Sequence, residues 1–177
     1  MASSIHIINS LTLDSAKLGD LASKVERVFH VPTEVVRSTV DVSRAFDQSR
    51  KQYNSTALLA LLFNQHPSSD IKYMLIVDVD LYIPVLTFVF GEAQLNGVAA
   101  VVSTHRLQNQ FYGLPSNPAA VMERLEKEVI HELGHTFGLF HCRQFECVMH
   151  SSTYVEEIDL KKADPCESCA ALLGEPG

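Results

Sequence analysis

The chain has 177 residues, of which 46% are hydrophobic and 20% charged, a composition typical of a globular protein long enough to bury a core. Its 21 acidic residues outnumber its 14 Lys and Arg, so there is no basic surplus to neutralise the phosphates of a nucleic acid. We therefore expect no nucleic-acid partner. Its longest apolar runs, such as 57–63 and 74–79, are far shorter than the ~20 residues of a membrane-spanning helix, so we expect no membrane partner either.

The N-terminal part of the sequence predicts a strand, a helix and a second strand. Residues 5–8 are typical of a short buried strand, and residues 14–29 have apolar side chains at helical spacing, with Asp14 or Ser15 as N-cap. The β-branched residues of 33–42 favour a strand. The first residues show no basic start, apolar stretch and cleavage site of a secretory signal, and we therefore expect a cytoplasmic protein.

The middle of the chain continues the alternation of helices and strands. A second helix is predicted over 55–65, ending before Pro67. The strands expected after it are 72–79, 86–90 and 97–103, the last two around a turn at Asn96-Gly97. This order predicts an α/β fold with a mostly parallel sheet.

A long helix is predicted after the loop 112–117. Asn117 can cap it, and Pro118 suits its first position, where no amide hydrogen is needed. Apolar residues then recur at spacings of three and four, and polar residues share the opposite face. The apolar stripe is Met122, Leu125, Val129 and Leu133, and the polar face is Glu123, Glu126, Lys127, His131 and His135.

Residues 131–141 read His-Glu-Leu-Gly-His-Thr-Phe-Gly-Leu-Phe-His. His131 and His135 are four apart, so on a helix their rings lie on one side, as two ligands of one tetrahedral zinc ion require. Glu132 can reach a metal-bound water, take a proton from it and pass it to the leaving amine. We therefore expect Glu132 to be the general base of a hydrolase.

The third expected ligand, His141, would face away from the metal if the helix continued. Gly138 can break the helix, because glycine accepts the left-handed conformation that ends helices. Three histidines and one water then make an open catalytic site. The alternative is three unrelated histidines, and the glycine and third histidine at these offsets argue against it.

The cysteines all lie in the last 36 residues, at Cys142, Cys147, Cys166 and Cys169. The separations within and between the two pairs are those of four-cysteine zinc sites. The alternatives are two disulfides or ordinary buried thiols. Because Cys142 directly follows His141, a second zinc would support the loop that positions the third histidine, and we assign this site a structural role.

The combination of His-Glu-x-x-His-x-x-Gly-x-x-His-Cys, a further cysteine, Met149 and a final Cys-x-x-Cys resembles the archaemetzincins, a family of metzincins. The specific motif covers 131–169. The resemblance implies one metallopeptidase domain over 1–177. Its upper subdomain, 1–138, would hold a mixed, mostly parallel twisted sheet with backing helices and the active-site helix. Its lower subdomain, 139–177, would hold the methionine turn and the cysteine zinc.

The resemblance also implies roles that the residues alone leave open. Met149 would form the hydrophobic floor of the metal site, although by itself it is equally consistent with core filling. An edge strand at 86–90 would pair with an extended peptide substrate. The protein would bind two zinc ions per chain, one catalytic and one structural. We expect it to be a monomer.

The leading hypothesis is a zinc-dependent metallopeptidase, with the choice between endopeptidase and aminopeptidase left open. The alternative is a catalytically silent or latent zinc protein that binds peptides, against which the intact Glu132 argues. Tyr154 could stabilise an oxyanion, but packing in the lower subdomain is the better interpretation. Asp78 and Asp80 could bind a cation, and a polar strand end is the simpler reading.

Overall fold

A computed structural model describes residues 2–10, 13–37 and 40–174. The strands are β1 (Ser4–Asn9), β2 (Thr33–Arg37), β3 (Phe46–Asp47), β4 (Gln52–Asn54), β5 (Ile71–Val77), β6 (Leu81–Tyr82), β7 (Gly91–Ala93) and β8 (Ala99–Ser103). The α-helices are α1 (Ser15–Phe29), α2 (Ser55–Gln65), α3 (Pro118–Thr136), α4 (Val155–Leu160) and α5 (Glu167–Leu173). Short 3₁₀ helices are η1 (Val42–Ala45), η2 (His105–Leu107) and η3 (Asn109–Tyr112). Within the described ranges, none of the helices is both long and apolar enough to cross a bilayer.

The main sheet has five strands in the order β2-β1-β5-β8-β7. Its first four strands are parallel, and β7 runs antiparallel to β8 at the edge. A smaller sheet has the order β3-β4-β6. The predicted fold class, a mixed and mostly parallel sheet with backing helices, is therefore confirmed.

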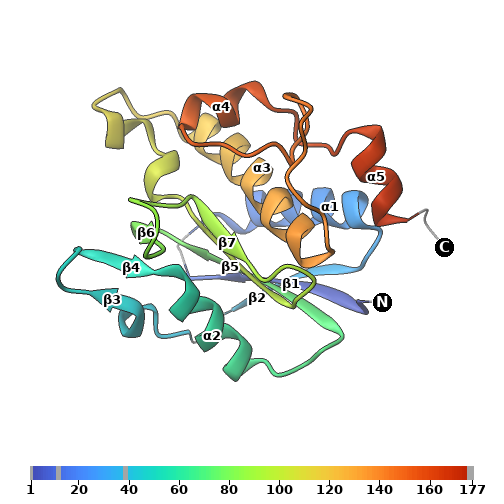
Figure 1. Cartoon of the computed structure of the whole chain (residues 1–177), viewed down its shortest axis with the longest axis horizontal. Helices are drawn as coiled ribbons and strands as arrows, with labels where there is room; N and C mark the ends of the chain where they lie inside the picture. The colour runs from blue at the N-terminus through green and yellow to red at the C-terminus, as the bar shows by residue number, and fades with distance from the viewer. Residues whose placement is uncertain (1, 11–12, 38–39, 175–177) are drawn as a thin grey trace.

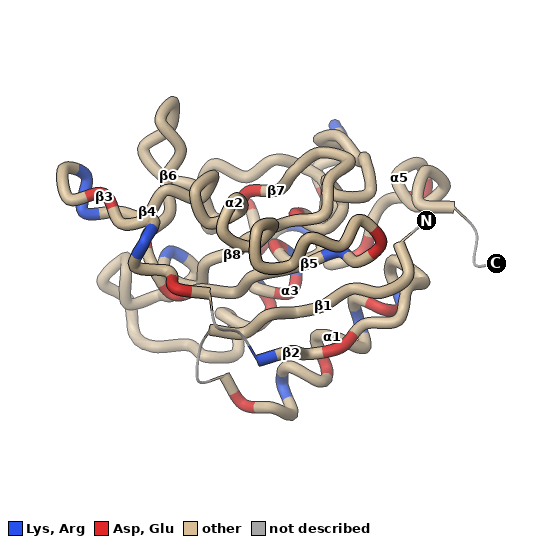
Figure 2. Tube along the Cα trace, turned by 90° about the horizontal axis from the view of Figure 1, so that it is seen from below, with Lys and Arg blue, Asp and Glu red and all other residues tan. Residues whose placement is uncertain are grey.

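Helices cover both faces of the main sheet. Figure 1 shows α1 and α3 on one face, α2 on the other, and the C-terminal segment with α4 and α5 beyond α3. Successive side chains of a strand point to opposite faces, so Met74 and Ile76 of β5 join the core with α1 and α3, whereas Leu75 and Val77 join the core with α2. The first core continues into the C-terminal segment through Met149. Figure 2 shows Lys and Arg scattered among Asp and Glu over the described trace.

The predicted helices are correct and two of the predicted strands are wrong in extent or place. The strand expected over 33–42 ends at Arg37, and Val42 begins a 3₁₀ helix, while 38–39 lie outside the described residues. The segment 86–90 is not a strand: Val89 forms an isolated bridge with Leu81, and the Phe90 carbonyl accepts the Ser103 amide at 2.9 Å.

Side chains explain why 86–90 leaves the sheet. Arg50 donates to the carbonyls of Leu86 and Thr87 at 2.9 and 3.3 Å, and Gln52 donates to the Thr87 carbonyl at 2.9 Å. These hydrogen bonds satisfy carbonyl groups that would otherwise accept the backbone amides of a neighbouring strand. The edge strand is instead β7, which begins at Gly91.

Helix α3 begins as predicted, with the Asn117 side chain accepting the Ala120 amide at 3.1 Å and Pro118 as its first residue. In its second half residues 128–134 are all buried, and His131 of the expected polar face lines a cleft. Glu126 of the expected polar face forms an ion pair with Lys24 of α1 at 2.7 Å. The helix is therefore enclosed between the sheet, α1 and the C-terminal segment.

Candidate metal centre

Backbone carbonyls orient two histidines of α3. The Nδ1–H of His131 donates to the Val148 carbonyl at 2.8 Å, and that of His135 donates to the Leu139 carbonyl at 2.7 Å. The Nε2 atoms of the two rings then lie 3.2 Å apart. A tetrahedral zinc ion with Zn–N bonds of about 2.0–2.1 Å separates two nitrogen ligands by about 3.3 Å, so this spacing fits a shared metal ion.

The end of α3 brings the third histidine back to the first two. Gly138 has a φ of +91°, and the amides of Gly138 and Leu139 bond to carbonyls of the last helical turn, which is the Schellman pattern. The ring centroid of His141 lies 4.9 Å from that of His135 and 5.3 Å from that of His131. The potential ligand atoms of the three rings all lie within 4.8 Å of one another. The structure therefore brings together the three predicted histidines.

The three histidines differ in access to solvent. His131 is buried, His135 is half-buried and His141 is exposed. A cleft of about 330 Å³ opens beside them, so a bound metal would keep one side accessible. The cleft is lined by residues 86–91 and 151–153 and by Glu128, His131, Glu132 and His141.

Burial favours the neutral form of the three imidazoles. It lowers the pKa of His131 well below the ordinary value, and the nearby ammonium of Lys161 acts in the same direction. Burial also lowers the pKa values of His135 and His141. Neutral imidazole is the form that binds zinc, so the protonation state matches the geometry.

Glu132 lies in the cleft wall with 6% of its surface exposed. Burial raises the pKa of its carboxyl group well above the ordinary value, and the charges of Glu128 and Glu92 act in the same direction. A Cβ atom on Gly91 would lie 2.7 Å from Cγ of Glu132 and 2.7 Å from the Val101 carbonyl oxygen. Gly91 of the edge strand therefore leaves the space that the glutamate occupies.

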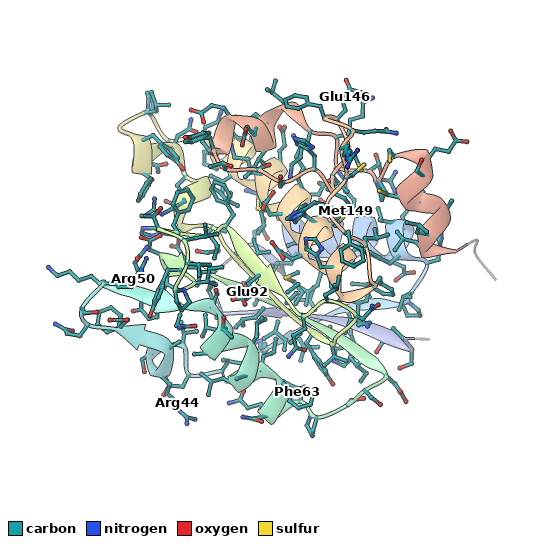
Figure 3. All side chains as sticks on the ribbon, viewed as in Figure 1. Arg44, Arg50, Phe63, Glu92, Glu146 and Met149 are labelled. Carbon is teal, nitrogen blue, oxygen red and sulfur yellow. The ribbon has the colours of Figure 1, made fainter. Side chains whose placement is uncertain are left out.

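Met149 is fully buried beside α3. Figure 3 shows it between α3 and the loop that follows this helix, with Glu92 on β7. A Cβ atom on Gly134 would lie 2.4 Å from the Met149 sulfur, so the thioether occupies the space that this glycine leaves next to His135. The methionine thus packs against the helical turn that carries the histidines.

The four cysteines form a second cluster. All four are free, their sulfur atoms lie within 4.8 Å of one another, and Sγ of Cys142 is 3.8 Å from Sγ of Cys166. Zn–S bonds of about 2.3 Å at a tetrahedral angle separate two sulfurs by about 3.8 Å, so the cluster fits a zinc ion. Backbone amides of Gln144 and Cys166 donate to Sγ of Cys142 and Cys147 at 3.4 and 3.3 Å.

The pKa values of the cysteines differ within the cluster. Burial raises the pKa of Cys147 and that of Cys169, whereas amide donation from Cys169 lowers the pKa of Cys166 to about 7. Grouped thiols in a partly buried place do not all ionise unless a cation compensates their charge. The donor set is therefore the chemistry of a thiolate-bound metal ion.

The sequence reasoning missed two charged residues at this site. Glu128 lines the cleft and forms a buried ion pair with Lys161, with 3.2 Å between Oε1 and Nζ. Glu128 lies three and four positions before His131 and Glu132, and this helical spacing was a signal in the sequence. Lys161 follows the short helix α4, and no pattern in the sequence distinguishes it.

Two other candidates take ordinary roles. Tyr154 is 65% exposed, so the packing that we expected for it is wrong, and it is not among the residues that line the cleft. Asp80 pairs with Arg106 at 2.5 and 2.8 Å, and Asp78 accepts from Thr104 and Gln108 at 3.0 and 2.8 Å. Both aspartates are satisfied by protein donors at the polar strand end.

The chain matches known proteins along most of its length. The sequence model of peptidase family M54 matches residues 15–175. The archaemetzincin of Haloquadratum walsbyi is 38% identical over 174 residues, which cover 92% of this chain and 99% of the relative. A solved zinc-dependent peptidase from Methanocorpusculum labreanum has a TM-score of 0.85 at 28% identity and covers 96% of this chain and 100% of its own. The solved archaemetzincin of Archaeoglobus fulgidus, complexed with malonate, has a TM-score of 0.78 at 34% identity. The match covers 96% of this chain and 99% of the solved one.

The fold, the histidine cluster with its buried glutamate and these matches define a zinc metallopeptidase, a hydrolase that acts on peptides or proteins. The chain belongs to peptidase family M54, the archaemetzincins. The resemblance seen in the histidine and cysteine motif is therefore confirmed.

Proposed function

We propose that His131, His135 and His141 hold the catalytic zinc ion and that Glu132 is the general base of peptide-bond hydrolysis. The observation that carries this proposal is the 3.2 Å spacing of the His131 and His135 Nε2 atoms on the wall of a cleft that Glu132 also lines. The carbonyls of Val148 and Leu139 keep both Nε2 atoms turned toward the shared position.

Zinc, when bound there, supplies a Lewis acid that polarises the scissile carbonyl and acidifies water. Glu132 takes one proton from the attacking water, whose oxygen bonds to the carbonyl carbon. The C–N bond then breaks, and Glu132 passes the proton to the departing amine nitrogen. The products are a new carboxyl end and a new amino end. Gly91 lacks a Cβ atom and so leaves room for the Glu132 side chain in the wall of this cleft.

We propose that the peptide lies in the cleft between residues 86–91 and 151–153. Arg50 and Gln52 hold the carbonyls of Leu86 and Thr87 on one side of the first segment, and the cleft lies along it. The exposed side chain of Leu86, 51% accessible, lines this cleft and offers an apolar contact for a substrate.

The cysteine cluster is proposed to hold a second, structural zinc ion, giving two per chain. Its 3.8 Å sulfur spacing and the direct link between His141 and Cys142 support this assignment. A reducing compartment such as the cytoplasm suits four metal-bound thiolates. Met149 and Gly138 are proposed as structural support of the histidine site.

The organisation of the chain is also a proposal. We infer one metallopeptidase domain over 1–177, with an upper subdomain at 1–138 and a lower one at 139–177, acting as a monomer without a nucleic-acid partner. The core that runs from the sheet and α3 into the C-terminal segment supports one domain. The mixing of basic and acidic residues in Figure 2 supports the absence of a nucleic-acid surface.

The test is cleavage of a peptide library by wild type and by Glu132→Gln, with zinc content measured for both. We expect two zinc ions per chain in each, and a loss of cleavage in the variant of at least ~10²–10⁴-fold. The matched control is Glu123→Gln, an exposed glutamate of the same helix, which should cleave as wild type does. Two zinc ions with no cleavage in wild type would favour a silent peptide-binding protein, and a fully active Glu132→Gln would exclude this glutamate as the base.

A further inference from the structure

The ammonium group of Lys161 is almost fully enclosed, with 1% of its side chain exposed, and makes three contacts. It donates to Oε1 of Glu128 at 3.2 Å, to the His150 carbonyl at 3.0 Å and to the Val148 carbonyl at 3.4 Å. An ammonium group has three donors, so each N–H has an acceptor. The three acceptors come from α3 and from both sides of Met149.

One of these acceptors also serves the first histidine. The Val148 carbonyl receives the Nδ1–H of His131 at 2.8 Å and Lys161 at 3.4 Å. The lysine therefore holds the very oxygen that sets the orientation of the His131 ring. Because the other end of the ion pair, Glu128, lies on α3 one turn before His131, the same ammonium ties the helix to the carbonyl.

We propose that Lys161, paired with Glu128, is a positioning residue for the zinc site that keeps the Val148 carbonyl and thereby His131 in ligating geometry. This inference rests on the proposed function, because it assumes that His131 binds zinc. Groups that orient a ligating histidine change metal affinity by roughly 10–100-fold when they are removed.

Stability alone gives little reason to bury this pair. Removing a lysine and a carboxylate from water is unfavourable for each ion, and well-packed apolar residues of similar volume are often as good or better for stability. The pair is 1% and 5% exposed at its two side chains, so it bears that cost in full. A role in holding the metal site accounts for its presence.

The chain offers a matched control in Lys127. Its ammonium donates to the carbonyls of Ile158 and Asp159 at 3.0 and 3.1 Å, so it also ties α3 to α4. It contacts neither Val148 nor His150. Replacing Lys127 thus removes a similar tie between helices without touching the carbonyl that orients His131.

The experiment compares Lys161→Met, the double variant Glu128→Met with Lys161→Met, and Lys127→Met. Zinc affinity at the histidine site is measured by competition with a chelator, and the d–d absorption spectrum of the cobalt-substituted site reports its geometry. We expect the first two variants to lose zinc from the histidine site with at least ~10-fold lower affinity and an altered cobalt spectrum, while the cysteine zinc stays. Lys127→Met should match wild type in affinity and spectrum.

The double variant separates positioning from folding, because it leaves no unpaired buried charge and should unfold near the wild-type temperature. A folded Lys161→Met or double variant with wild-type affinity and spectrum would overturn the proposal, as would an equal loss in Lys127→Met. If neither Lys161 variant folds, the pair serves the fold and the proposal is wrong. Wild type without zinc at the histidines would instead contradict the proposed function.

Discussion

The three histidines and the four cysteines use neighbouring stretches of chain, and in each cluster two donor atoms lie at the spacing of a tetrahedral edge. The distance is 3.2 Å between Nε2 of His131 and His135 and 3.8 Å between Sγ of Cys142 and Cys166. The histidines adjoin a cleft of about 330 Å³, and each ring of the helical pair is held by a carbonyl behind it. The cysteines supply a fourth protein donor where the histidines leave an open side.

In the proposed function, this difference separates a site for chemistry from a site for folding. An open coordination position admits water and substrate, whereas four cysteine sulfurs fill every coordination position of a tetrahedral zinc ion with protein ligands. The histidine cluster and the cysteine cluster meet at the peptide bond between His141 and Cys142, so a change in the position of Cys142 directly affects the position of His141. The following variants test this contrast.

The largest effect is expected from Cys169→Ser. Loss of one thiolate from the proposed closed cluster should remove one zinc ion per chain and lower the free energy of unfolding by several kcal/mol, because the binding energy of a structural zinc is folding energy. Zinc analysis and thermal unfolding measure it. The control is Ser168→Ala, an exposed neighbour on α5. A Cys169→Ser protein with two zinc ions and unchanged stability would remove the structural role from this cluster.

Gly138→Ala should act on the open site. The residue has a φ of +91°, which strains any residue with a side chain, and a Cβ there would also lie 2.4 Å from Oδ1 of Asn96, so we expect the turn to shift and to carry His141 with it. We expect a loss of about 1–3 kcal/mol in stability together with weaker zinc binding at the histidines. Gly113→Ala separates the two causes, because Gly113 has a φ of +73° and no neighbour within 4 Å. Equal metal affinity in both variants would contradict the role of this turn.

The smallest effect is expected from Asp80→Asn, which lies outside both clusters. Burial raises the pKa of Asp80, but the hydrogen bonds and charge of Arg106 outweigh it and leave the pKa below the ordinary value. The ionised carboxylate therefore stabilises the fold above the unfolded pKa of ~3.9, and this stabilisation is lost as the pH falls through the folded-state pKa.

At pH 7 we expect Asp80→Asn to lose about 1–2 kcal/mol, with a gap to wild type that narrows below pH ~4. Denaturant unfolding across pH measures the gap, and zinc content should stay at the wild-type value. A gap that is constant from pH 3 to 7 would show that the carboxylate charge contributes nothing. A change in either metal cluster would show that the clusters depend on distant ion pairs.

Much of the fold follows from local chemistry in the sequence. Helix α2 spans the predicted residues 55–65, and α3 begins at Pro118 with the Asn117 cap, because capping and propensity act over a few neighbouring residues. The motif spacing also predicted which histidines and cysteines come together, since helical geometry and a glycine break are local as well. Their roles as ligands remain predictions.

What the sequence could not show depends on residues that are distant along the chain. The segment 86–90 has the composition of a strand, yet Arg50 and Gln52 bind its carbonyls and the edge strand begins at Gly91. The Glu128–Lys161 pair spans 33 residues and has no local pattern. Glycine at 91 is required because the Glu132 side chain and the Val101 carbonyl oxygen occupy the neighbouring space. Local propensity determined the helices and the donor spacing, whereas packing between distant segments decided the edge of the sheet and the surroundings of the site.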